Sequence, residues 1–336
     1  MRPIGVIGAG SFGTALAVVE AGTGRAVRLW ARRPEAARSL ATERENRTYL
    51  AGVHFPPSLA VCADLADLAA ADPVLVAAPS HGFRDVLRQF LAVRGGVPAT
   101  IVSATKGVEL ESLARMSEVA AEEGARVGAA LEFAVLSGPT FAAELARGVP
   151  SAAVIACERA ELAAELQTAL ASPTFRLYSS SDVVGVELAG AAKNVIAIAA
   201  GLLSGLGLGH NTLAALITRG LHEMTRLSVA YGGELKTLSG LAGLGDLVLT
   251  CTGALSRNRR TGIELAQGKT LAEIQAETTE VAEGVKNSRA IRRLADERGV
   301  EMPIIEQMVA VMYEGKSPKQ ALRDLMTREL KEESRL

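Results

Sequence analysis

Short apolar runs rich in β-branched residues alternate with longer amphipathic stretches through the first half of the chain. Such runs are typical of strands buried on both faces, and the stretches between them are typical of helices. The predicted strands cover residues 4–7, 26–31, 73–78, 100–104, 133–136 and 151–156. The predicted helices cover residues 14–21, 35–45, 64–70, 83–91 and 113–123, whereas residues 46–60, with Pro56-Pro57, are predicted to be a loop. This alternation predicts an α/β domain with a mostly parallel sheet.

The pattern changes near residue 182, where strand-like runs stop and alanine-rich helical periodicity begins. The predicted helices of this part cover residues 182–203, 213–231, 263–267, 271–276, 288–298, 304–314 and 318–331. We therefore expect two domains: an α/β domain over residues 1–181 and an all-helical domain over residues 182–336.

A glycine-rich turn, Gly8-Ala9-Gly10-Ser11-Phe12-Gly13, joins the first predicted strand to the first predicted helix. In this G-x-G-x-x-G spacing, Gly8 permits a tight turn, Gly10 lets the backbone approach a pyrophosphate, and Gly13 lets helix and strand pack closely. The amides at the helix N-terminus then face the phosphates. Because it lies between a strand and a helix, the motif predicts a Rossmann-type dinucleotide site. The alternative is a glycine-rich turn with no ligand.

Two arginines follow the second predicted strand, where an NAD-type site would place an acidic residue that binds the ribose 2′-hydroxyl. These residues are Arg32 and Arg33, and the first acid, Glu35, comes only after a proline. Guanidinium groups suit a 2′-phosphate. The sequence therefore predicts NADP(H) as the preferred cofactor, with NAD(H) as the second choice. A solvated arginine pair on a surface loop is the alternative.

Composition and net charge argue against some classes of binding partner. The chain has 336 residues, of which 49% are hydrophobic and 22% are charged, as in a globular protein with a large core. Its formal net charge of −1 gives no reason to expect nucleic acid or an anionic membrane as a partner.

The cysteines are odd in number and scattered without metal-binding spacing: Cys62, Cys157 and Cys251. This usage fits a reducing compartment and predicts no metal site and no disulfide framework. Residues 1–3 lead directly into the first predicted strand, so no signal peptide is expected. The apolar run over residues 183–208 carries Glu187 and Lys193, so no membrane span is predicted. We therefore expect a cytoplasmic protein.

Polar residues at strand ends are the first candidates for chemistry, because ligands of such sheets bind beyond the carboxyl ends of the strands. The sequence places at this edge Ser80, His81, Lys106, Gly138 and Thr140. His81 and the other isolated histidines, His210 and His222, have no suitably spaced partner, and we interpret them as structural.

Lys193 lies in the middle of a predicted helix whose neighbouring positions are small or apolar. A desolvated lysine has a lowered pKa and can exchange a proton near neutral pH. A lysine whose amine extends to the surface is the alternative.

A polar, glycine-rich stretch interrupts the helical half of the chain and is predicted to be a functional loop. It contains Gly243-Leu244-Gly245-Asp246-Leu247, Thr250, Thr252 and Ser256-Arg257-Asn258-Arg259. Within it, Arg257 could hold a phosphate group through its guanidinium fork. The alternative is a solvated arginine at the start of a helix.

These motifs together resemble those of the NAD(P)-dependent glycerol-3-phosphate dehydrogenase family, of the bacterial biosynthetic kind, over nearly the whole chain. Beyond the glycine-rich turn, the resemblance rests on Ala104-Thr105-Lys106-Gly107, Ser137-Gly138-Pro139-Thr140-Phe141-Ala142, Glu187-Leu188-Ala189-Gly190-Ala191-Ala192-Lys193-Asn194-Val195, Gly243-Leu244-Gly245-Asp246-Leu247 and Ser256-Arg257-Asn258-Arg259. One departure is Phe12, where the bacterial family often has tryptophan; both side chains are flat and apolar.

The resemblance implies an oxidoreductase that reversibly reduces dihydroxyacetone phosphate to sn-glycerol 3-phosphate for phospholipid synthesis. It implies Lys193 as the proton donor and acceptor. The substrate-binding positions it implies are Lys106, Gly138, Thr140, Lys193, Asp246, Ser256, Arg257 and Asn258. The cofactor-binding positions it implies, with the three glycines, are Ser11, Phe12, Arg32, Arg33, Lys106, Ala142, Arg257, Val281 and Glu283.

Two other functions stay open at this stage. One is a two-domain NADP-dependent reductase of a non-phosphorylated ketone or keto acid, and the other is a non-catalytic protein that senses NADP. The sequence also leaves the oligomeric state open, with a homodimer among the options.

Overall fold

The computed structural model describes residues 2–277, 282–330 and 332–333. The chain forms two compact units. One comprises Met1–Lys106 and Ala114–Val183, and the other comprises Gly107–Leu113 and Val184–Leu336. The short segment Gly107–Leu113 therefore belongs to the helical unit although it lies in the first half of the sequence.

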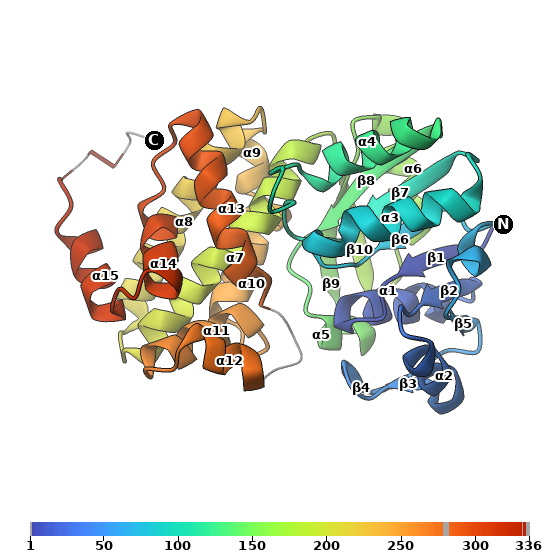
Figure 1. The fold of residues 1–336 in the computed structure, drawn as a ribbon, viewed down its shortest axis with the longest axis horizontal. Helices are drawn as coiled ribbons and strands as arrows, with labels where there is room; N and C mark the ends of the chain where they lie inside the picture. The colour runs from blue at the N-terminus through green and yellow to red at the C-terminus, as the bar shows by residue number, and fades with distance from the viewer. Residues whose placement is uncertain (1, 278–281, 331, 334–336) are drawn as a thin grey trace. The chain divides into compact units, whose positions relative to one another are not determined.

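An eight-stranded sheet forms the centre of the first unit, in the order β10-β9-β8-β7-β6-β1-β2-β5 (Figure 1). Its strands are β1 (Ile4–Ile7), β2 (Val27–Trp30), β5 (Leu59–Cys62), β6 (Val74–Val76), β7 (Ala99–Ser103), β8 (Leu131–Ser137), β9 (Ser151–Ala156) and β10 (Phe175–Ser180). Neighbouring strands pair in parallel except β8 and β9, which pair antiparallel. The predicted α/β domain with a mostly parallel sheet is confirmed.

Helices cover both faces of this sheet: α1 (Ser11–Gly22), α2 (Pro34–Glu43), η1 (Leu65–Leu68), α3 (Ser80–Arg94), α4 (Met116–Val127), α5 (Ala142–Ala146) and α6 (Ala160–Leu170). One hydrophobic cluster joins α1, α2, α5 and α6 to one face, and a second joins η1, α3 and α4 to the other. Successive side chains of β1 point to opposite faces of the sheet, because Val6 belongs to the first cluster and Ile7 to the second. Burial on both faces explains why the strands are continuous apolar runs.

The predicted loop over residues 46–60 is wrong in part. Strands β3 (Glu45–Asn46) and β4 (Leu50–His54) form an antiparallel hairpin there, and β5 begins at Leu59. The hairpin is a separate two-stranded sheet that contributes Leu50 and Val53 to the cluster beneath α1. The sequence did not indicate it because only every third residue of β4 is buried, which breaks the alternation expected of a strand.

The second unit is all-helical in its described part. Its elements are α7 (Val183–Gly205), α8 (His210–Ala230), α9 (Leu235–Leu238), the π-helical turn η2 (Leu241–Gly245), α10 (Asp246–Thr252), α11 (Arg257–Ala266), α12 (Leu271–Glu277), α13 (Glu283–Arg298), α14 (Pro303–Tyr313) and α15 (Pro318–Met326). The fold as a whole, a Rossmann-type unit followed by a helical one, is therefore as predicted.

Most of the predicted polar loop over residues 243–259 is helical instead, so this prediction is wrong. It spans η2, α10 and the start of α11. A Cβ at Gly243 would overlap the backbone of Leu238. This glycine therefore serves close backbone packing between α9 and η2, not the flexibility of a loop.

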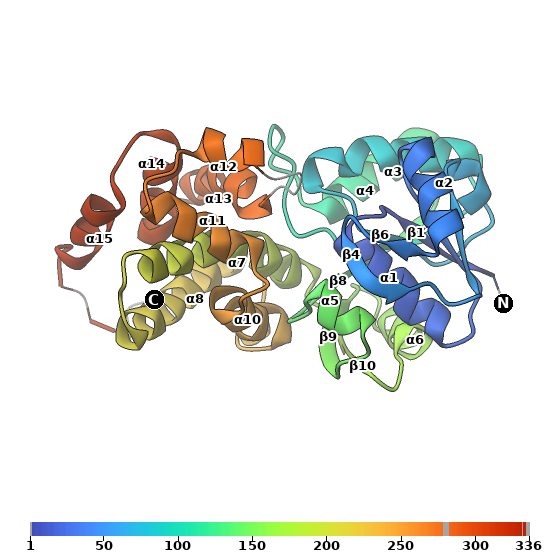
Figure 2. The same cartoon turned by 90° about the horizontal axis from the view of Figure 1, so that it is seen from below.

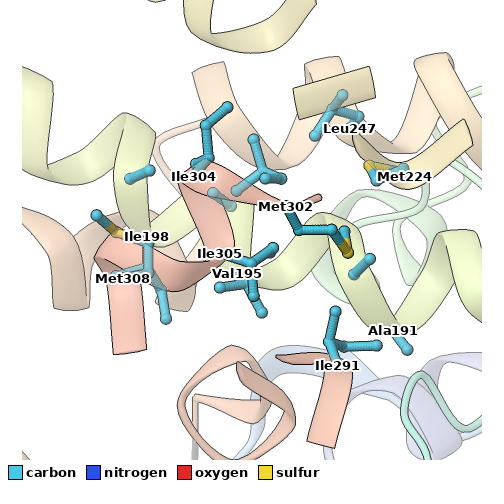
Figure 3. Close-up of a cluster of buried hydrophobic side chains, with 14 of the residues drawn as sticks. Ala191, Val195, Ile198, Met224, Leu247, Ile291, Met302, Ile304, Ile305 and Met308 are labelled. Atoms are coloured by element: carbon cyan, nitrogen blue, oxygen red, sulfur yellow. The ribbon is translucent and has the colours of Figure 1, made fainter. Parts of the chain in front are cut away.

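Helix α7 is the centre of the second unit. Figure 3 shows its residues Ala191, Val195 and Ile198 among apolar side chains from α8, α10, α13 and α14. The helix is long and apolar enough to cross a membrane, but 94% of its most apolar window is buried inside the protein. This burial is what a core helix of a globular unit shows, and it explains the apolar sequence without a bilayer.

Candidate active site

The glycine-rich turn after β1 has the geometry that a pyrophosphate site needs. Gly8 has φ +112°, and a Cβ there would lie 2.7 Å from the carbonyl oxygen of Ala77. A Cβ on Gly13 would overlap the carbonyl oxygen of Gly8. A Cβ on Gly10, by contrast, would meet no protein atom within 4 Å. The fold itself therefore requires Gly8 and Gly13, whereas the missing side chain of Gly10 leaves space for a ligand.

Helix α1 begins directly at this space. Gly10 is its N-cap and gives no side-chain cap to the first turn, which carries Ser11 and Phe12. A helix N-terminus offers backbone N–H groups and the positive end of the helix dipole to an anion. The turn thus fits the pyrophosphate of a dinucleotide.

Arg32 and Arg33 follow β2, at the start of α2, and both are exposed. Within the part of the chain that the structure describes, neither guanidinium makes a hydrogen bond or an ion pair. Two unneutralised cations at the end of the second strand suit a ribose 2′-phosphate.

Residues from neighbouring strand ends meet at the carboxyl edge of the sheet. The Nζ of Lys106, beyond β7, donates a hydrogen bond to the carbonyl oxygen of Gly138, beyond β8, at 3.2 Å. The hydroxyl of Thr140 donates to the same oxygen at 3.2 Å. The Lys106 amine also lies 5.9 Å from the centroid of the Phe12 ring, at the start of α1. The structure therefore brings together four residues that the sequence predicted from three separate motifs.

The other predicted residues of this unit lie around that edge. Ala142 is half-buried at the start of α5. Ser80 and His81 form the first turn of α3, where Ser80 is buried and His81 is exposed.

In the second unit, Lys193 is 4% exposed and forms a buried ion pair. Its Nζ lies 2.6 Å from Oδ1 of Asp246 and donates a hydrogen bond to Oγ1 of Thr250 at 2.7 Å. The Thr250 hydroxyl donates in turn to the Asp246 carbonyl oxygen at 2.7 Å. Asp246 and Thr250 are four residues apart on α10, so one helix face presents both acceptors. The Asp246 carboxylate stabilises the ammonium form of Lys193, an influence absent from the sequence argument, which considered only helix neighbours.

The side-chain amide of Asn258 connects three helices, and one of its partners is Asn194, next to Lys193. Nδ2 of Asn258, in the first turn of α11, donates to Oδ1 of Asn194 at 2.9 Å. Oδ1 of Asn258 accepts from the backbone N–H of Gly284, in α13, at 3.0 Å. These bonds fix Asn194, Asn258 and Gly284 relative to one another. Each of the three is the chain neighbour of a candidate site residue: Lys193, Arg257 and Glu283, respectively. Asn258, which the resemblance implies as a substrate-binding residue, is therefore buried and bonded to two other helices.

The remaining predicted residues of this unit lie at helix starts. Ser256 caps α11 by accepting from the backbone N–H of Arg259 at 3.2 Å, and Arg257 follows it, exposed. Arg257 also lines a cavity of about 470 Å³ together with Arg260 and Lys286. Glu283 is half-buried at the start of α13, whereas Val281 lies outside the described residues.

Cys251 lies beside this network but does not take part in it. Burial raises the pKa of its thiol to about 12, so the group stays neutral and unreactive near neutral pH. The acid–base chemistry available here belongs to the lysine.

Two polar residues with central positions were missed by sequence reasoning. In the sequence, Asn194 stands out only as part of a motif, and Asn46 falls in the predicted loop over residues 46–60. The pairing of Asp246 with Thr250 could have been found from their four-residue spacing, had that segment been recognised as a helix.

Two family models match this chain. Residues 3–163 match the family described as NAD-dependent glycerol-3-phosphate dehydrogenase N-terminus, and residues 182–323 match the corresponding C-terminus family. A glycerol-3-phosphate dehydrogenase [NAD(P)+] from Geobacter metallireducens is 51% identical, covering 98% of this chain and 98% of that protein. One from Nitratidesulfovibrio vulgaris is 49% identical, covering 98% of this chain and 99% of that protein.

Among solved structures, a glycerol-3-phosphate dehydrogenase from Coxiella burnetii is similar over both units. Its TM-score is 0.92 at 39% sequence identity, covering 97% of this chain and 99% of that one.

Proposed function

We propose that this chain, which belongs to the NAD-dependent glycerol-3-phosphate dehydrogenase family, reversibly reduces dihydroxyacetone phosphate to sn-glycerol 3-phosphate and prefers NADPH. As a member of that family it is an oxidoreductase that uses NAD(P). The single observation that carries the proposal is the buried Lys193, held between Asp246 and Thr250. A buried lysine with a fixed amine suits proton transfer to an oxygen that gains charge during a reaction.

The nicotinamide of a bound cofactor would supply or accept the hydride. In the direction of reduction, the substrate oxygen becomes an alkoxide, and Lys193 donates a proton from Nζ to it. Asp246 and Thr250 hold the amine in place for this transfer, and in oxidation Lys193 takes the proton back.

The substrate phosphate gives the protein a second point of attachment, remote from the reacting carbon. Exposed Arg257 can bind it through two parallel N–H···O bonds. Lys106, held by the Gly138 carbonyl oxygen, adds positive charge at the carboxyl edge of the sheet. Binding energy from the phosphate then orients the carbonyl for reaction.

Arg32 and Arg33 support NADPH as the preferred cofactor, since both lie exposed after β2 without an acidic residue beside them to bind a 2′-hydroxyl. We assign the reaction to the cytoplasm, as a supply of sn-glycerol 3-phosphate for glycerophospholipid synthesis.

Oxidation of NADPH by the purified protein tests the proposal directly. The substrates to compare are dihydroxyacetone phosphate, dihydroxyacetone and a non-phosphorylated keto acid, with chiral analysis of the product. We expect rapid turnover with dihydroxyacetone phosphate alone. Equal turnover of dihydroxyacetone would contradict a phosphate-binding Arg257, turnover of the keto acid alone would indicate another reductase, and tight NADPH binding without any turnover would indicate a sensor.

A further inference from the structure

Asn46 is a polar side chain buried against the glycine-rich turn, and none of the residues assigned above explains it. It lies on the β3–β4 hairpin, outside the main sheet, and is 2% exposed. Figure 2 shows β4 running beside α1, so the hairpin covers the start of the dinucleotide site from one side.

The amide of Asn46 bonds to both sides of the turn. Its Nδ2 donates to the carbonyl oxygen of Ala9 at 3.0 Å and to Oγ1 of Thr14 at 2.8 Å. Its Oδ1 accepts from the backbone N–H of Tyr49, within the hairpin, at 3.2 Å. Because Ala9 offers only an acceptor and Tyr49 only a donor, these partners determine which amide atom is nitrogen and which is oxygen. Asn46 thus joins the hairpin, the turn and the first helical turn in one buried contact.

The bond to Ala9 determines the direction of the next amide. The carbonyl of Ala9 and the N–H of Gly10 belong to one planar trans peptide unit, so they point to opposite sides. When Asn46 holds the carbonyl, the Gly10 N–H points away from the hairpin. Gly10 is also the position where a Cβ would meet no protein atom, and in the described chain its N–H has no acceptor.

Without this contact the Ala9–Gly10 peptide would have more conformational freedom. Gly8 and Gly10 both lack a Cβ, and glycine loses more freedom than any other residue when it is fixed. An anion would then have to order the backbone as it binds, which weakens binding.

We propose that Asn46 is a positioning residue for the cofactor: it holds the Ala9–Gly10 peptide so that the Gly10 amide is oriented toward the pyrophosphate before the dinucleotide binds. This inference rests on the proposed function for the identity of the ligand. It assigns to the hairpin a part in cofactor affinity, in addition to its packing against α1.

Binding of two ligands to Asn46→Ala, without catalysis, tests the proposal. NADPH contains the pyrophosphate, whereas adenosine 2′-monophosphate contains the adenosine and the 2′-phosphate but no pyrophosphate. We expect the Kd of NADPH to rise on the order of tenfold, as for one lost hydrogen bond that organises a site. The Kd of adenosine 2′-monophosphate should not change. A substitution that only destabilised the unit would raise the Kd of both ligands by the same factor. That result, or an unchanged Kd for NADPH, would overturn the proposal.

Glu45→Ala is the matched control. It removes a hydrogen bond of the same hairpin, from the Gly52 N–H to Oε1 of Glu45 at 2.9 Å, without touching the turn. It should leave both Kd values unchanged, and weaker NADPH binding in this variant as well would assign the effect to the hairpin and contradict the role of Asn46.

Thr14→Val keeps the proposal testable if Asn46→Ala does not fold. It removes one partner of Asn46 but preserves side-chain shape, so NADPH binding should weaken by a smaller factor, and Thr14→Ser should restore it. No change in Thr14→Val would count against the proposal. Wild-type protein is measured first: if it does not bind NADPH, the proposed function fails, whereas normal wild-type binding with unaffected variants refutes only the role of Asn46.

Discussion

Arg32 and Arg33 of the sheet unit and Lys193 of the helical unit present their positive charges in opposite ways. In the sheet unit, Arg32 and Arg33 are exposed and Lys106 is half-buried against a neutral carbonyl oxygen. In the helical unit, Lys193 is buried beside a carboxylate that is itself 1% exposed. The sheet unit therefore leaves Arg32 and Arg33 for a ligand to neutralise, whereas the helical unit neutralises Lys193 within the protein.

This difference separates binding from catalysis in a way that mutations can measure. Exposed cations contribute little to folding, so their removal should change ligand affinity and leave stability nearly intact. A buried pair is strongly coupled to folding, because removing one member leaves the other charged without compensation. Loss of Lys193 should thus affect stability and turnover together, and the two effects need to be separated by a second substitution.

Lys193→Met is expected to have the largest effect. It removes the proton donor, and kcat should fall by roughly 10²–10⁴, the range for loss of a general acid. It also leaves Asp246 buried without its cation, which should lower the free energy of unfolding by about 3–5 kcal/mol. Steady-state kinetics and denaturant unfolding measure the two effects.

The double variant Lys193→Met/Asp246→Asn separates those effects. Because the uncompensated carboxylate is gone, much of the lost stability should return, while kcat should stay low. Recovery of kcat along with stability would show that Lys193 acts only in packing and would direct attention to Lys106 as the proton donor.

The double variant Arg32→Ser/Arg33→Ser is expected to have a smaller effect, which is confined to cofactor binding. The KM of NADPH should rise about tenfold or more, since a hydrogen bond to a charged group contributes about 1.5–3 kcal/mol. The KM of NADH and the unfolding midpoint should change little, because both side chains are exposed.

Arg38→Ser serves as the control for this pair, because Arg38 is an exposed cation on the adjacent helix α2 that pairs with Glu35 at 3.5 Å. It removes a nearby positive charge without altering the end of β2. Equal losses for NADPH and NADH in the double variant would show that the pair does not recognise the 2′-phosphate.

Local patterns predicted the first unit well and the partners of buried polar groups poorly. Apolar runs and the glycine spacing are properties of adjacent residues, and they were sufficient to predict the parallel sheet and the turn after β1. The partners of the Asn46 Nδ2 atom lie 32 and 37 residues away, and Asp246 lies 53 residues from Lys193. Periodicity contains no information on such contacts, because they depend on how distant segments pack. The same limit explains the error over residues 243–259, where glycines that allow close helix packing were interpreted as a loop.

The smallest effect on activity is expected at a buried acid outside either candidate site. Glu223, on α8, is 2% exposed and accepts hydrogen bonds from the backbone N–H groups of Ile304 and Ile305, at 2.7 and 3.2 Å. These amides lie in the first turn of α14, so Glu223 holds the start of that helix. Burial raises the pKa of its carboxyl to about 8, although the two N–H groups favour the charged form.

The sign of the resulting pH dependence follows from this raised pKa. Between about pH 4.5 and about pH 8 the folded state retains a proton that the unfolded state has lost, so the contribution of Glu223 to stability falls as pH rises. Each pH unit in that window costs at most about 1.4 kcal/mol. The glutamine of Glu223→Gln cannot titrate, so the difference in unfolding free energy between wild type and variant should change steadily over the window. The variant should become more stable relative to wild type toward pH 8. Denaturant unfolding at several pH values measures this difference, and kcat should be unchanged. A constant difference across the window would show that the carboxylate is already ionised when it binds the two amides, and that the helix start, not burial, determines its charge.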